Sequence, residues 1–286
     1  MKNFKIILIA LSVVMGALTI VPTAQSDTTT VTTTTDDDDE KVTVTATKAL
    51  RDLGCQVKAG SSCVRKDLRK LASLNLTSVD LTGMNFTGSN LTGVDFSKAV
   101  LNKVNFSGAN LSGVNLTKAE ANSANFSNAN LTKADLTRID ADGANFTATS
   151  LREANLTSGS FVKGKFNKVK AARAILANAD LSKSTGQSAD FSYADLTEAN
   201  FEQVNFKNAN FTKSSGIDTR FADAQLPGAK FVSSDLQDPD FSGSNLRNAN
   251  LTKSTITRDM LDSANYCGAT LRDGYLIEDE DECDNI

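Results

Sequence analysis

Large hydrophobic residues return at every fifth position between Leu71 and Leu276, without an insertion or a deletion. Leu or Phe fills most of these positions, which we call centres, and Ile256 and Tyr266 fill two more. The centres that lack a large side chain are Ala121, Ala141, Ala171, Gly186 and Gly216. An α-helix returns one face about every 3.6 residues and a strand about every two, so neither explains this period. A repeat of fixed length over such a distance indicates a solenoid.

The positions beside each centre follow a second regular pattern. The residue two places before is small, most often Ala, and the next is most often Asn or Asp, as in Ala109-Asn110-Leu111. Ser and Thr are common directly after the centre, as in Leu91-Thr92. Asn and Asp tolerate unusual backbone angles and hydrogen-bond nearby backbone groups, so we expect them to support a tight turn in each repeat.

The repeated A(N/D)LXX or A(N/D)FXX unit resembles the pentapeptide-repeat family over residues 71–276. The resemblance implies an all-β fold, a right-handed quadrilateral β-helix in which four pentapeptides form one square coil. The centre and the small residue would point inward, and the other three residues outward. Residues 71–276 would then form about 10.5 coils, stacked at about 4.8 Å.

The distribution of Phe supports a coil of 20 residues, in which centres 20 apart stack on one face. A core ladder is predicted from an unbroken series at this spacing: Phe86, Phe106, Phe126, Phe146 and Phe166. Beyond it, Phe moves to two other series, Phe191/Phe211/Phe231 and Phe201/Phe221/Phe241. Such compensation is expected where a narrow interior is packed to constant volume. We interpret Gly186 and Gly216 as weakly packed points, with local bulges or small loops that carry a contact site as the alternative.

Two segments precede the repeats and differ from them in composition. Residues 1–26 predict an export signal, because Lys2 and Lys5 precede an apolar run that ends in small residues. An uncleaved membrane anchor is the alternative. Residues 27–47 are rich in Thr and contain an acidic run at 36–40, which is typical of a flexible tether.

The ends of the repeat region are expected to be covered. Residues 48–70 predict a helical N-terminal cap of two short helices, because Leu50, Leu53 and Leu68 have approximately helical spacing to their apolar neighbours. Residues 277–286 form an acidic C-terminal tail.

Four cysteines flank the repeats, at Cys55, Cys63, Cys267 and Cys283. Their spacing does not resemble a zinc site, and the chain contains no His. The Cα atoms of a disulfide lie within about 7 Å, and the rod would separate the first two cysteines from the last two. We therefore expect the disulfides Cys55–Cys63 and Cys267–Cys283, with free thiols as the alternative. Export would place them in an oxidising compartment.

The formal net charge of −4 arises from the two ends of the chain. Residues 41–277 contain 28 Lys and Arg against 22 Asp and Glu, so the repeat region is mildly basic. One cluster falls entirely on outward positions of a single coil, which we call the basic band: Lys163, Lys165, Lys168, Lys170 and Arg173. We consider it a candidate site for an anionic partner, with a solvated face as the alternative.

The sequence offers no catalytic residues, no cofactor site and no metal site. His is absent, no glycine-rich phosphate loop occurs, and the recurring acids occupy repeat positions. We therefore expect a non-catalytic, exported structural or protein-interaction solenoid, similar to exported pentapeptide-repeat proteins of cyanobacteria. Its compartment would be the periplasm, the thylakoid lumen or the extracellular space.

The expected partner is a protein or an envelope component, neither a small-molecule substrate nor nucleic acid. Membrane contact would require an uncleaved signal, and the two caps favour a monomer. A cell-surface or envelope adhesion module is one alternative. Another follows from the family, because some members mimic DNA and bind type II topoisomerases such as gyrase. A basic rod and an export signal argue against that function here.

Overall fold

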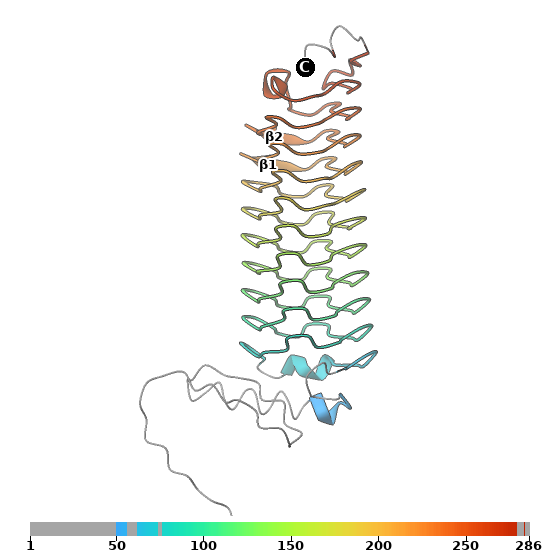
Figure 1. Ribbon diagram of the computed structural model, residues 1–286, viewed down its shortest axis with the longest axis vertical. Coiled ribbons are helices and arrows are strands. Elements are labelled where there is room, and N and C mark those ends of the chain that lie inside the picture. Colours follow the sequence, from blue (N-terminus) through green and yellow to red (C-terminus); the bar gives the residue numbers. More distant parts are fainter. Residues whose placement is uncertain (1–49, 56–61, 74–75, 279–282, 284–286) are drawn as a thin grey trace, which may run out of the picture.

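The structure, a computed structural model, describes residues 50–55, 62–73, 76–278 and 283. The chain forms a straight rod of stacked coils, with a helical segment at residues 50–52 beside its lower end (Figure 1). The predicted export signal and tether lie outside the described residues, as does most of the predicted acidic tail. Within the described ranges, no helix combines the length and the apolar character needed to cross a membrane.

Parallel bridges join residues that are 20 apart through the rod. Asn105 pairs with Asn125, and Asn125 pairs with Asn145. The N–H of Phe126 donates to the carbonyl of Asn145 at 2.8 Å, and the N–H of Asn145 donates to the carbonyl of Ala124 at 2.9 Å. Hydrogen bonds therefore connect each coil to the next on every side, and the predicted coil of four pentapeptides is confirmed.

Four series of centres, each in steps of 20 residues, define the faces of the rod. Face 1 runs from 81 to 241, face 2 from 86 to 246, face 3 from 91 to 251 and face 4 from 96 to 256. The two residues after each centre turn the chain onto the next face. Faces 1 and 3 are therefore opposite one another, as are faces 2 and 4.

Most corners of the coil are β-turns with one left-handed residue. The N–H of Ala134 donates to the carbonyl of Leu131 at 3.1 Å, and Lys133 between them has a φ of 59°. A positive φ at the third residue is required in type II turns. The Oδ1 of Asn130 accepts hydrogen bonds from the N–H of Thr132 at 3.2 Å and from its Oγ1 at 2.6 Å.

The prediction that Asn and Asp support the turns is confirmed by such side-chain hydrogen bonds, but the unusual backbone angle falls three residues later. At that position the chain carries Gly in some repeats and mainly Lys, Ser, Asn, Asp or Glu in others. The Asn and Asp themselves lie in the bridges between coils.

Phenylalanine rings fill the core in two arrangements. On face 2 the rings of the predicted ladder, from Phe86 to Phe166, stack with neighbouring centroids 5.0–5.4 Å apart. Higher in the rod, rings from faces 1 and 3 meet edge to face across the interior, as Phe211 and Phe221 do at 5.6 Å. Ala121 and Ala141 are fully buried on face 1, beside the face 2 ladder. Large and small side chains thus alternate around the coil to fill the same cross-section.

The two glycine centres keep the register, so the alternative of loops at these points is wrong. The N–H of Gly186 donates to the carbonyl of Asn205 at 2.8 Å. Gly216 lies in strand β1 (Ser215–Ile217), which pairs in parallel with strand β2 (Asp235–Gln237) one coil above. A Cβ at Gly216 would lie 2.6 Å from the Oγ1 of Thr219. A neighbouring side chain thus replaces the missing one.

The coils begin earlier than the sequence predicts. Cys63 and Leu68 are buried at centre positions, and their N–H groups donate to the carbonyls of Asn85 and Asn90 at 2.7 and 2.8 Å. The bridges here span 23 residues, because the 3₁₀ helix η1 (Arg69–Ser73) adds three residues before the next coil. The predicted second cap helix is therefore wrong over residues 62–68. Residues 50–52 are helical, and Leu50 is buried.

At the other end, the regular coils stop before Leu276. The 3₁₀ helix η2 (Asp259–Leu261) interrupts the last face 1 repeat. Leu276 is 42% exposed whereas Ile277 is 1% exposed, so the predicted centre at Leu276 is wrong. Thr270 and Leu276 form an antiparallel bridge, which shows that the chain folds back over the final coil.

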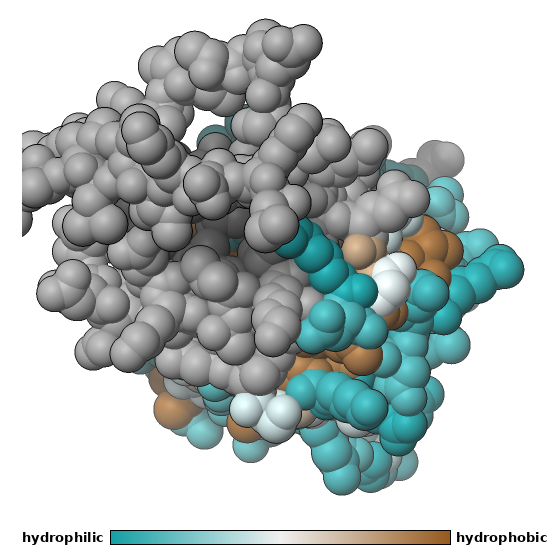
Figure 2. Space-filling view, turned by 90° about the horizontal axis from the view of Figure 1, so that it is seen from below, coloured by the Kyte–Doolittle hydropathy of each residue, from teal (hydrophilic) through white to brown (hydrophobic). Residues whose placement is uncertain are grey.

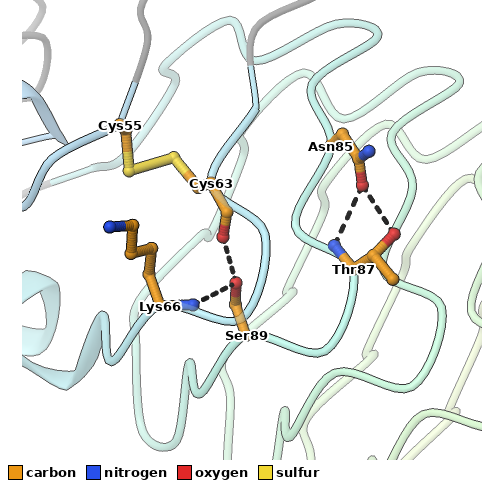
Figure 3. The surroundings of a disulfide bond; sticks show 6 residues. All are labelled: Cys55, Cys63, Lys66, Asn85, Thr87 and Ser89. Atoms are coloured by element: carbon orange, nitrogen blue, oxygen red, sulfur yellow. Dashed lines mark hydrogen bonds between the residues drawn. A yellow bond between two sulfur atoms is a disulfide. The ribbon is translucent and has the colours of Figure 1, made fainter.

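Both predicted disulfides are present, one near each end of the rod. The Cα atoms are 4.8 Å apart in Cys55–Cys63 and 5.1 Å apart in Cys267–Cys283. In Figure 3 the Oγ of Ser89 donates to the carbonyl of Cys63 and accepts from the N–H of Lys66 at 3.1 Å. These bonds connect the first disulfide to the coil above. Figure 2 views this lower end, where hydrophobic surface is visible between hydrophilic residues.

Candidate interaction surface

Three residues of each pentapeptide point outward, and in the lower coils many of them satisfy one another. The Nδ2 of Asn125 donates to the Oδ1 of Asn105 at 3.2 Å on face 2, and the Nδ2 of Asn130 donates to the Oδ1 of Asn110 at 3.1 Å on face 3. The Oδ1 atoms also bind the turns, as at Asn130. These ladders carry no charge.

The basic band interrupts this neutral surface. Lys165 and Lys170 precede centres on faces 2 and 3, where the coils below carry Asn, or Ser at 150. Lys163, Lys168 and Arg173 occupy left-handed corner positions, with φ values of 59°, 56° and 60°. All five side chains are exposed. The structure therefore places the predicted band across two adjacent faces and the corners that bound them.

The band is part of a larger separation of charge around the rod. We define the basic side by position within each coil. It begins at the second residue after the face 1 centre, ends at the second residue after the following face 3 centre, and includes every outward residue between them. The remaining outward residues form the acidic side. Of the 18 Lys and Arg between residues 80 and 255, 14 lie on the basic side: Lys103, Lys133, Arg152, Lys163, Lys165, Lys168, Lys170, Arg173, Lys183, Lys207, Lys213, Lys230, Arg247 and Lys253.

The acids of the same range lie mainly on the opposite side. Of the 17 Asp and Glu, 14 lie on the acidic side: Asp80, Asp95, Glu120, Asp135, Asp140, Asp142, Asp180, Asp195, Glu198, Glu202, Asp218, Asp235, Asp238 and Asp240. The two sides carry formal charges of +11 and −10, although the range as a whole sums to +1. The near-neutral rod is therefore strongly polarised across its width.

Few of these charges are paired within the chain. Between residues 80 and 255 the ion pairs are Lys133–Glu153 at 3.7 Å and Arg220–Glu202 at 3.4 Å. Exposed pairs of this kind contribute about 0–1 kcal/mol each. The other charged side chains of this range form no ion pair, so their charge remains available to a partner.

A third described pair lies below this range. The side chain of Arg69 donates to both carboxylate oxygens of Asp67, at 2.9 and 2.7 Å, and these hydrogen bonds lower the pKa of Asp67 to about 2. This ion pair stabilises the start of the solenoid and adds no net charge to the surface.

One aromatic residue that the sequence analysis missed belongs to the basic side. Tyr193, which is 49% exposed, lies on the corner between faces 3 and 4. The guanidinium carbon of Arg173 and the Nζ of Lys213 each lie 5.3 Å from its ring centre, one from the coil below and one from the coil above. Such cation–π contacts hold the cations in place along the corner. These three residues are 20 apart in the sequence, and that spacing could have predicted the contact.

The surface has the chemistry of a contact site. No group of three or more His, Cys, Asp or Glu able to hold a metal ion occurs in the part of the chain that the structure describes. Core side chains fill the interior of the coils, and the charges lie on the outside. What this arrangement offers is long-range electrostatic attraction from a rigid support.

Comparison with known proteins places the repeats in context. A family model described as pentapeptide repeats (8 copies) matches residues 71–108, 109–147 and 129–170, and one described as pentapeptide repeat region matches 184–261. No curated protein matches the chain.

Several solved structures are similar. HetL, a pentapeptide repeat protein involved in heterocyst differentiation regulation from Nostoc sp. strain PCC 7120, is 28% identical, with 71% of this chain and 93% of HetL covered and a TM-score of 0.48. QnrB1, a plasmid-mediated fluoroquinolone resistance protein, is 18% identical, with coverage of 69% and 91% and a TM-score of 0.38. A pentapeptide repeat protein from the Arabidopsis thaliana thylakoid lumen is 25% identical, with coverage of 45% and 68% and a TM-score of 0.26.

Together the two family models cover more than half of the chain, and their repeats agree with the 20-residue bridges. The chain therefore belongs to the pentapeptide-repeat family of right-handed β-helices.

Proposed function

We propose that the protein is a non-catalytic, exported solenoid that presents its basic side to an anionic protein or envelope component. One observation carries the proposal: 14 of the 18 cations between residues 80 and 255 lie on that side. A rod that served only as a spacer would need no such sorting.

The rigidity of the support favours binding. Every coil between residues 80 and 240 is bridged to the next at a constant 20-residue offset, and the centres are buried. A partner that docks on this surface orders few backbone groups, so little of the interaction energy is lost to ordering. The cations themselves are long side chains at known heights along the rod.

Export is supported by the disulfides. Both bonds lie near the ends of the rod, and structural disulfides persist mainly in oxidising compartments. The test is fractionation of cells that express the tagged full-length chain, combined with thiol labelling. We expect protein in the exported fraction with blocked thiols; cytoplasmic protein with four reactive thiols would overturn the export proposal.

Partner binding is tested by recovery from the exported fraction on immobilised protein. The variant K165Q/K168Q/K170Q removes three cations from the basic side, and K98Q/K118Q/R138Q removes three exposed cations from the acidic side as a matched control. We expect the first variant to lose the anionic partner and the second to retain it. Equal recovery on both variants, or no specific partner on the wild-type rod, would contradict the proposal.

A further inference from the structure

The acidic side has a charge nearly equal and opposite to that of the basic side, and this complementarity identifies a partner. A receptor for any polyanion needs cations on one side only. Here the opposite side concentrates 14 of 17 acids. Two rods placed next to each other in the same orientation would bring the basic side of one against the acidic side of the other.

The spacing of the two surfaces also matches. In both, charged side chains lie in columns whose members are separated by multiples of 20 residues, because the bridges keep a 20-residue offset throughout. Two copies therefore have the same axial repeat, and charges of opposite sign can be brought to matching heights at several coils. Most charges in this range form no ion pair within their own chain, so they do not have to break one to form another.

The heights of the charges favour a parallel arrangement without axial shift. Above residue 150 the basic side carries 12 cations and three acids, and the acidic side carries eight acids and one cation, Arg220. In an antiparallel arrangement this basic half would meet the lower acidic side, where Lys98, Lys118 and Arg138 form a column of like charge. Parallel packing avoids that repulsion.

We propose that the anionic partner of the basic side is the acidic side of a second copy of this chain, so that rods associate laterally and in parallel. The inference rests on the proposed function as a binding solenoid and names its partner. Because the two contact surfaces lie on opposite sides of each rod, the association is heterologous and does not close, and further copies add to either side.

The test is sedimentation velocity of the full-length protein at about 0.02 M and about 0.5 M salt, conditions in which the Debye length changes several-fold. We expect a concentration-dependent series of oligomers at low salt and a monomer at high salt. A monomer in both conditions would overturn the inference, and so would oligomers that survive high salt.

Two charge-reversal variants identify the surfaces. K207E/K230E/R247E changes the basic side, and E198K/D218K/D238K changes the acidic side at similar heights; none of these side chains forms an ion pair. Each variant alone should be monomeric. An equimolar mixture should form the concentration-dependent series of oligomers again, because the intact surfaces pair with each other and the reversed charges of the two altered surfaces meet at similar heights. Oligomers of either variant alone, or a monomeric mixture, would contradict lateral pairing.

The outcome also separates the inference from the proposed function. If the wild-type rod is monomeric at low salt but still captures an anionic partner that K165Q/K168Q/K170Q loses, self-association is wrong and the proposed function stands. If neither occurs, both are wrong.

Discussion

The ring of Phe206 occupies the space that a side chain at Gly186 would fill. A Cβ built on Gly186 would overlap the Cε1 atom of that ring. Phe206 also comes within 6.4 Å of Phe166, measured between centroids, although the two residues are two coils apart. The missing side chain and the tilted ring are thus two parts of one packing arrangement, at the point where Phe leaves face 2.

Substitution of Gly186 by Ala should therefore destabilise the rod by about 1–3 kcal/mol, since overpacking forces side chains off their preferred rotamers. The free energy of unfolding in urea measures this. Phe206→Leu removes the overlapping atoms, so the double variant should lose less than the two single variants combined. Additive losses would show that the ring and the Cβ do not collide.

Backbone conformation at the corners gives a second prediction. Lys118 has a φ of 58°, and Gly113 has a φ of 65° with no atom within 4 Å of an added Cβ. Lys118→Gly should stabilise the protein by up to about 1 kcal/mol, and Gly113→Ala should cost about 1 kcal/mol, because left-handed angles strain residues that carry a Cβ. Thermal unfolding of the two variants should move in opposite directions, and shifts of the same sign would refute the explanation.

The disulfide at the C-terminal end should act locally. Closing a loop of 16 residues stabilises the folded state by roughly 3 kcal/mol in the chain-entropy treatment. In a solenoid each coil contacts only its neighbours, so the loss should be confined to the adjacent coils. In the C267S/C283S variant, amide exchange should accelerate over residues 262–277 and remain unchanged over 120–150. Uniform acceleration along the rod would contradict this.

Asp67 provides a prediction for acid pH. Its folded-state pKa is lowered from 3.8 to about 2, so the bond to Arg69 contributes stability that is fully present above about pH 4. This contribution is lost as the pH falls toward 2. By NMR titration, Arg69→Gln should return the pKa of Asp67 toward 3.8, whereas Lys70→Gln should change it little. An unchanged pKa in the Arg69 variant would show that the hydrogen bonds do not form.

The core could be predicted from the sequence because the same packing constraint is repeated many times. Each coil must fill the same cross-section. The Phe at 126 therefore predicts large aromatic side chains directly below and above it, at 106 and 146. The ends lack this redundancy. Cys63 occupies a centre without matching the Leu and Phe pattern, and a three-residue addition at η1 places it out of register. At the C-terminal end, Leu276 fits the period, yet the chain has left the coil and buries Ile277 in its place.

The surface was also predicted only in part, and the reason differs from the one that applies to the ends. The basic band stands out as a run of nearby cations, but the separation of charge extends over residues that are 20 apart. Lys207 and Arg247 adjoin no other cation in sequence, and on the rod they lie in one column. A charge total for residues 41–277 averages the two sides and conceals them.

The constant offset between coils restricts how such a chain changes in length. An inserted pentapeptide would lengthen the rod by a quarter of a coil and rotate everything above it by one face, which carries charged columns onto new neighbours while the interior stays filled. Only a whole multiple of 20 residues would preserve the outer pattern. An addition that is not a multiple of five residues has another result, which η1 shows. The three extra residues are taken up in a short helix, and the regular register then resumes.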